Sequence, residues 1–82
     1  MQLYPFNALD LRKRADLLWS YGTFIAVCRC KKPYVQYFMV NDFFVEMQFD
    51  PSSVKMLGLI AFEGGERYER MLEAIDLQKL GI

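Results

Sequence analysis

Histidine is absent from the sequence, and cysteine occurs only twice, at Cys28 and Cys30. A structural zinc site takes four nitrogen or sulfur ligands, so one chain lacks half of them. A zinc site would then require two chains, which together supply four cysteines. Two strand residues two positions apart place their Cβ atoms about 6–7 Å apart, too far for an unstrained disulfide. We therefore expect packed free thiols, no metal and no cofactor.

Net charge is absent as well, because ten basic residues balance ten acidic ones. A neutral chain lacks the long-range field that draws proteins to nucleic acid or to anionic lipid. The basic cluster Arg12-Lys13-Arg14 spreads around the exposed side of a predicted helix, which favours a solvated face. The charge pattern thus predicts no nucleic-acid partner and no membrane partner.

Long apolar runs and targeting signals are missing too. No apolar stretch approaches the roughly 20 residues that span a bilayer, and the first residues show no basic segment followed by an apolar one. Linkers, repeats and low-complexity tracts are also absent. The sequence therefore predicts a single domain over residues 1–82, located in the cytoplasm, where thiols stay reduced.

Apolar residues, by contrast, are abundant, since 54% of the 82 residues are hydrophobic and 16% are aromatic. A small domain without a partner usually has fewer, because proportionally more of it faces water. Four runs rich in β-branched and aromatic residues predict strands at 24–31, 34–40, 43–49 and 54–62. Short connections such as Asn41-Asp42 predict hairpins and hence an antiparallel meander. Gly58, inside the last run, indicates a bulge or a close backbone approach.

Helical patterns flank these strands. We expect the first helix to begin after Asn7 as N-cap, with Asp10 at the third helical position, and to end before Gly22. The second helix follows Gly64-Gly65, and its apolar residues have the spacing i, i+3, i+4, i+7: Tyr68, Met71, Leu72 and Ile75. The order α-β-β-β-β-α predicts an α+β fold in which a four-stranded antiparallel meander is flanked by an N-terminal and a C-terminal helix in two layers.

Hairpin turns also set the register and therefore the two faces of the predicted sheet. We expect both helices to cover an inner face on which Phe43 and Val45 are fully buried, with Trp19 and Leu72 among their neighbours. The predicted inner face consists of Ile25, Val27, Phe38, Val40, Phe43, Val45, Met47, Phe49, Val54, Met56, Ile60 and Phe62.

The outer face should be polar in a two-layer domain, yet it is apolar here. Its predicted apolar members are Phe24, Ala26, Cys28, Val35, Tyr37, Met39, Phe44, Leu57 and Leu59. So large an apolar surface is rarely left open in a monomer. Four covers are possible: a second subunit, a partner protein, a ligand, or one of the helices in a three-layer arrangement.

One predicted row across the outer face, formed by Cys28, Tyr37, Glu46 and Leu57, contains a carboxylate. Burying that carboxylate is costly unless it is paired. Glu46 is either a half-exposed strand residue or a polar anchor to which Tyr37 donates a hydrogen bond. A catalytic role is not expected, because the chain has no histidine and no second carboxylate converges on Glu46.

A family resemblance spans nearly the whole chain. It is carried by Phe6-Asn7, Leu18-Trp19 before Gly22, Phe43-Phe44-Val45-Glu46, Phe62 and Ile75-Asp76-Leu77. These elements resemble a group of small, uncharacterised proteins of Bacteroidetes genomes. The resemblance implies a recurring cytoplasmic domain and no particular reaction or ligand.

Two functional hypotheses follow from the apolar outer face. The first is a small cytoplasmic interaction module that forms a homodimer, or binds another protein, through this face. The alternative is a small-molecule binding protein that holds an apolar or aromatic ligand there, with Tyr37 and Glu46 as polar contacts. No catalytic constellation is visible, so we do not expect an enzyme. The predicted binding residues are Tyr37, Glu46, Phe44, Met39, Leu57 and Leu59.

Overall fold

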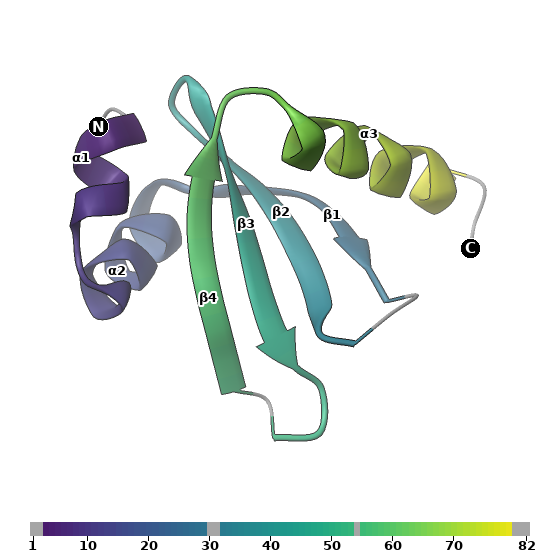
Figure 1. Cartoon of the computed structure of the whole chain (residues 1–82), viewed down its shortest axis with the longest axis horizontal. Coiled ribbons are helices and arrows are strands. Elements are labelled where there is room, and N and C mark those ends of the chain that lie inside the picture. Colours follow the sequence, from purple (N-terminus) through teal and green to yellow (C-terminus); the bar gives the residue numbers. More distant parts are fainter. Residues whose placement is uncertain (1–2, 30–31, 54, 80–82) are drawn as a thin grey trace.

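The computed structural model describes residues 3–29, 32–53 and 55–79. Seven elements follow one another (Figure 1): α1 Leu3–Ala8, α2 Leu11–Tyr21, β1 Thr23–Cys28, β2 Tyr34–Val40, β3 Phe43–Asp50, β4 Lys55–Phe62 and α3 Glu66–Lys79. This arrangement confirms the α+β class and the antiparallel sheet between N-terminal and C-terminal helices. The predictions for Cys30 and Val54 lie outside the described residues.

The four strands form one sheet in the order β1-β2-β3-β4, with every neighbour antiparallel. The two-residue turn Asn41-Asp42 joins β2 to β3 and sets Val40 opposite Phe43, as predicted. Asn41 adopts a φ of 53°, the left-handed conformation that such turns require and that asparagine tolerates. The central hairpin therefore follows directly from its turn chemistry.

The helices cover opposite faces of the sheet, which differs from the expected two-layer arrangement. Helices α1 and α2 pack on the inner face, defined by Phe38 and Val45. Helix α3 packs on the outer face, defined by Tyr37 and Val35, and lies mainly over β1. Figure 1 shows α1 and α2 on one side of the sheet and α3 on the other. Both faces are apolar, so each gains from helical cover.

Two extra residues in the edge strands reverse part of the expected face assignment. In β4, Gly58 pairs with Gln48 and Met56 with Phe49, which leaves Leu57 as an inserted residue. In β1 the register shifts between Phe24 and Ala26. Because strand side chains alternate, each insertion reverses the faces on one side of it: the residues before it in β1 and those after it in β4. Five expected placements are therefore wrong. Leu59 packs in the core under α1 and α2, and Phe24 pairs with Phe38 on the same inner face. Ile25 and Phe62 pack on the α3 side, and Ile60 pairs with Glu46 on that outer face.

The inner cluster is the larger of the two cores. Its buried members are Phe6, Ala15, Leu18, Phe38, Val40, Phe43, Val45, Met47, Leu59 and Ala61. Val45 has an exposed fraction of 0% and Phe43 one of 1%, so both are buried as predicted. One of their two expected neighbours is missing, because Leu72 belongs to α3 and lies on the opposite side of the sheet. Trp19 is 63% exposed and touches the rim of this cluster edge-on at Phe38.

The ends of α2 differ from the expected capping pattern. Asn7 lies inside α1, and the N-cap of α2 is Asp10, whose carboxylate accepts a hydrogen bond from the backbone N–H of Lys13 at 2.9 Å. Gly22 ends the helix as predicted, but its backbone is extended rather than left-handed. A Cβ atom there would lie 2.5 Å from the carbonyl oxygen of Leu18. The close approach of the Leu18 carbonyl therefore favours glycine at position 22.

Two side chains close the β4 edge of the sheet. The Asn7 amide pairs with the backbone of Ala61, donating to its oxygen at 3.1 Å and accepting from its N–H at 3.0 Å. Arg14 donates to the carbonyl oxygens of Leu9, Asn7 and, from a second segment, Leu59. Open strand edges invite pairing with other chains. Asn7 and Arg14 therefore both attach α1 to the sheet and block this edge.

Candidate functional site

A cavity of about 350 Å³ lies between α3 and the outer face. Its floor consists of five strand residues: Cys28, Val35, Tyr37, Glu46 and Gln48. Its wall is formed by one side of α3, from Arg70 to Leu77, and its end by Lys32 and Pro33. Helix α3 thus covers the outer face only in part, and a hollow remains beside it.

Glu46 is the only charged residue that is buried in the described part of the chain, with an exposed fraction of 2%. Its Oε1 atom accepts a hydrogen bond from Nε2 of Gln48 at 3.2 Å. Its Oε2 atom lies 3.2 Å from Nε of Arg67, which forms an ion pair without a hydrogen bond. Oε2 therefore has a compensating charge but no hydrogen-bond donor among the described residues. The half-exposed alternative for Glu46 does not hold.

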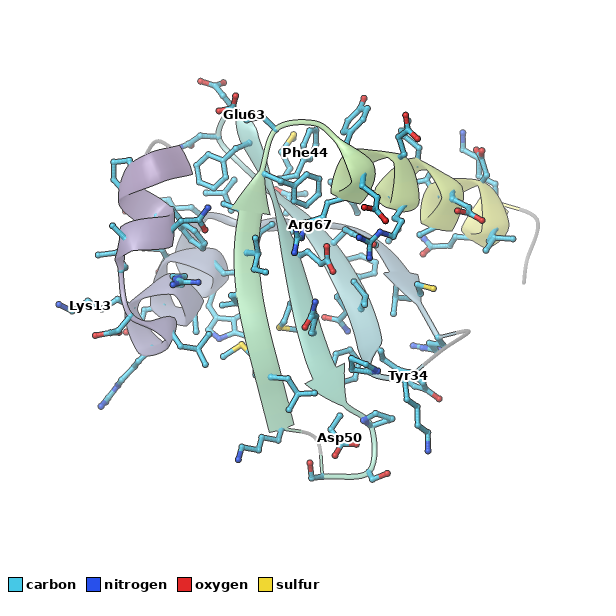
Figure 2. All side chains as sticks on the ribbon, viewed as in Figure 1. Lys13, Tyr34, Phe44, Asp50, Glu63 and Arg67 are labelled. Carbon is cyan, nitrogen blue, oxygen red and sulfur yellow. The ribbon has the colours of Figure 1, made fainter. Side chains whose placement is uncertain are left out.

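The ion pair is positioned by the start of α3. Gly65, with a φ of 82°, turns the chain after β4, and the helix begins at Glu66. Arg67 is in its first turn, and Figure 2 shows its side chain lying over the middle strands of the sheet. The Arg67 side chain is partly exposed, although its Nε atom is buried, and the Glu46 side chain is almost fully buried. A buried carboxylate needs such a partner to remain charged.

Tyr37 lies directly opposite Glu46 in the β2–β3 ladder and is also buried. Its ring packs edge-on against Phe62 at a centroid distance of 6.3 Å. Burial, together with the nearby Glu46 carboxylate, raises the pKa of Tyr37 to about 12. The hydroxyl is therefore protonated at neutral pH and able to donate. The hydrogen bond to Glu46 that the polar-anchor alternative predicts is not made; that carboxylate accepts from Gln48 and faces Arg67.

The raised pKa of Tyr37 gives a spectroscopic prediction. In an alkaline titration followed by phenolate absorbance, Tyr37 should ionise near pH 12. Because the folded pKa exceeds the unfolded value, the associated stability is present below about pH 10 and lost as the pH rises toward 12. Tyr37→Phe should remove this step, whereas Tyr21→Phe, at an exposed position, should leave it in place. Loss of the step in Tyr21→Phe alone would contradict the assignment.

The six predicted binding residues do not form one surface. Tyr37 and Glu46 line the cavity. Phe44 is half-buried under α3, with ring contacts to Phe62 at 5.8 Å and Tyr68 at 5.6 Å. Met39 and Leu57 are exposed, and Leu59 is buried on the inner face. The placement of Leu59 is therefore corrected by the bulge in β4.

The predicted row across the outer face is correct only at its centre. Tyr37 does pair with Glu46. The outer strands contribute Ala26 opposite Tyr37 and Ile60 opposite Glu46, in place of Cys28 and Leu57. Cys28 still reaches the cavity from one position farther along the same face. In β1 the pairing with β2 is displaced by two residues, since Cys28 pairs with Val35. In β4 a similar displacement, present where Asp50 pairs with Lys55, adds to the inserted Leu57.

Sequence reasoning missed the residues that α3 contributes to the cavity. Arg70, Glu73, Ala74 and Leu77 have the spacing i, i+3, i+4, i+7 and so share one helix face. This spacing was available in the sequence, but the neighbouring stripe of Tyr68, Met71, Leu72 and Ile75 is more apolar. Arg67 had no such signal, because its role depends on which sheet face receives the helix.

No family model, curated protein or solved structure matches this chain. The resemblance to a group of small bacterial proteins therefore stays a prediction. Within residues 3–29, 32–53 and 55–79, no helix is long and apolar enough to cross a membrane. The same described residues contain no group of three or more cysteines and carboxylates able to hold a metal ion.

Proposed function

We propose that this protein binds a small, largely apolar molecule in the cavity between α3 and the sheet. The observation that carries this proposal is the placement of two buried polar groups, Glu46 and Tyr37, on the floor of a 350 Å³ hollow. Ligand sites are concave and mostly apolar, with a few polar groups that fix orientation, and they measure roughly 300–1,000 Å³. The cavity beside α3 has such a composition, and its volume lies near the lower end of this range.

Self-association through the outer face stays a prediction, with less support than ligand binding. The contiguous apolar surface that favoured a homodimer is interrupted, because α3 covers Phe44 and part of Tyr37. The two exposed members, Met39 and Leu57, lie near opposite ends of the sheet, on β2 and β4. A stable interface needs a connected patch of about 800 Å² per partner.

Cavity filling tests the proposed function. N-phenyl-1-naphthylamine, an uncharged fluorescent probe, should bind the parent protein at one site and lose binding in Ala74→Phe, since Ala74 is buried on the cavity wall. Leu72→Phe is the matched control, because Leu72 is on the same helix but exposed and outside the cavity lining. Leu77→Phe, at a half-buried position of the wall, serves if Ala74→Phe does not fold. Equal probe binding in all folded variants would contradict the proposal.

A further inference from the structure

The floor of the cavity carries a donor without an acceptor. The Tyr37 hydroxyl makes no hydrogen bond within the described residues. It is not sealed either, because the buried and unbonded side-chain atoms of those residues are Glu46 Oε2 and Arg67 Nε, which face each other. Tyr37 as a whole is 3% exposed and lines the cavity, so the accessible surface of its oxygen opens into the hollow. A group held in the cavity can therefore reach this hydroxyl.

The environment of the hydroxyl decides what kind of group it bonds. Burial and the nearby Glu46 carboxylate raise the pKa of Tyr37 to about 12, so its O–H is intact at neutral pH. The same carboxylate opposes a second negative charge beside this oxygen, which disfavours an anionic acceptor. A phenol O–H that is almost fully buried and unbonded has lost a hydrogen bond that water would supply. An uncharged acceptor, such as a carbonyl oxygen or a ring nitrogen, would restore that bond.

The charged residues around the cavity favour neither sign of ligand charge. The buried ion pair is neutral as a whole, and Arg70 is paired with Glu66 at 3.4 Å. The two other charged lining residues, Lys32 and Glu73, are exposed and of opposite sign. A charged ligand would give up hydration on entering the hollow and meet no buried counter-charge that lacks a partner. The balance of charges is therefore consistent with an uncharged ligand.

The shape and size of the cavity point to a ring system. Sheet residues form its floor and one helix side forms its wall, with Val35, Ala74 and Leu77 as apolar contacts. A cavity of about 150 Å³ holds one benzene molecule. A hollow of 350 Å³ therefore has room for about two fused rings.

We propose that the ligand is an uncharged two-ring compound whose carbonyl oxygen or ring nitrogen accepts a hydrogen bond from the Tyr37 hydroxyl. This inference rests on the proposed function and narrows it to a chemical class. The ring body lies against Val35, Ala74 and Leu77, with the acceptor toward the floor. Quinoline and coumarin are compounds of this class.

Two probes of equal size test the hydrogen bond, each on the parent protein and on Tyr37→Phe. Quinoline carries a ring nitrogen, and naphthalene has the same shape without an acceptor. Titrations followed by amide chemical shifts of ¹⁵N-labelled protein give the dissociation constants. Tyr37→Phe should weaken quinoline binding about fivefold to tenfold, because the ring nitrogen loses its donor, and should leave naphthalene binding unchanged. Tyr21→Phe, exposed and outside the cavity lining, should change neither.

Two further measurements use the parent protein alone. With the tyrosines labelled at ¹³Cζ, quinoline should shift the Tyr37 resonance more than naphthalene does, because this carbon is bonded to the donating oxygen. The second measurement compares 2-naphthamide with 2-naphthoate, which present an uncharged and an anionic acceptor on the same ring body. The amide should bind more tightly than the carboxylate.

The outcomes separate this inference from the function on which it rests. If neither quinoline nor naphthalene shifts the cavity residues, the proposed function itself fails. If both bind and Tyr37→Phe affects them equally, the cavity is a binding site but the inferred class is wrong. Binding of 2-naphthoate at least as tight as that of 2-naphthamide would overturn the uncharged class. Equal shifts of the Tyr37 resonance by quinoline and naphthalene would overturn the hydrogen bond even if Tyr37→Phe does not fold.

Discussion

Val45→Asp is expected to abolish folding. Val45 lies at the centre of β3, paired with Phe38 and Ala61, and has an exposed fraction of 0%. Its neighbours in the inner cluster are apolar, so the new carboxylate would be buried without a partner. The penalty of several kcal/mol is comparable with the total stability of a small domain. Circular dichroism should show a loss of native signal and of the cooperative thermal transition.

Met39→Asp is the matched control for this substitution. It introduces the same group on the neighbouring strand, but at an exposed position. Its effect on the free energy of unfolding should stay within about 0.5 kcal/mol, as for most surface substitutions. A folded, cooperatively melting Val45→Asp variant would mean that the α1 and α2 side of the sheet is not its sealed core.

Arg14→Ala is expected to destabilise the protein by about 3 kcal/mol, because hydrogen bonds to charged groups contribute roughly 1.5–3 kcal/mol each and are not additive. Arg14 bonds the carbonyl oxygens of Asn7 and Leu9 at the end of α1 and that of Leu59 in β4. Removing it weakens the attachment of α1 to the sheet, which the Asn7 amide alone then maintains, and leaves the β4 edge less protected. Urea unfolding measures the loss of stability, and light scattering during storage measures association through the less protected β4 edge.

Arg12→Ala is the control for Arg14→Ala, since Arg12 is exposed on the same helix. Arg14→Lys keeps the positive charge, but the lysine ammonium lacks the planar guanidinium that bonds three carbonyl oxygens. This variant should therefore lose less stability than Arg14→Ala but remain below the parent protein. Equal unfolding free energies for Arg12→Ala and Arg14→Ala would contradict the role of Arg14 at the sheet edge.

The sequence predicts the central hairpin well because both of its determinants are local. Asn41-Asp42 dictates a two-residue turn, and the alternation from Phe43 onward dictates which side chains share a face. The edge strands were predicted less well. Gly58 indicates a bulge in this strand. The bulge itself lies at Leu57 and decides the face of Leu59, and its place depends on how β4 pairs with β3.

The candidate site was predicted only at its centre. Tyr37 and Glu46 stand out because they are polar groups on an apolar face, and their pairing follows from the hairpin. The choice of face by α3 is a tertiary property, since its apolar stripe would fit either side of the sheet. Arg14 is a second example of a tertiary role. The sequence predicts that it belongs to a solvated basic cluster, whereas its hydrogen bonds join α2 to the end of α1 and to β4.

The order of the elements along the chain has a consequence for biosynthesis. A ribosome delivers residues from the N-terminus, so α1, α2 and all four strands emerge before Glu66–Lys79. The inner face can be covered as soon as β4 is made, whereas the outer face waits for α3. During that interval Glu46 has no Arg67 beside it and places a charge in the middle of a largely apolar surface. A single charge of this kind discourages a nascent sheet from sticking to other chains, so the carboxylate that the finished protein buries also protects the unfinished one.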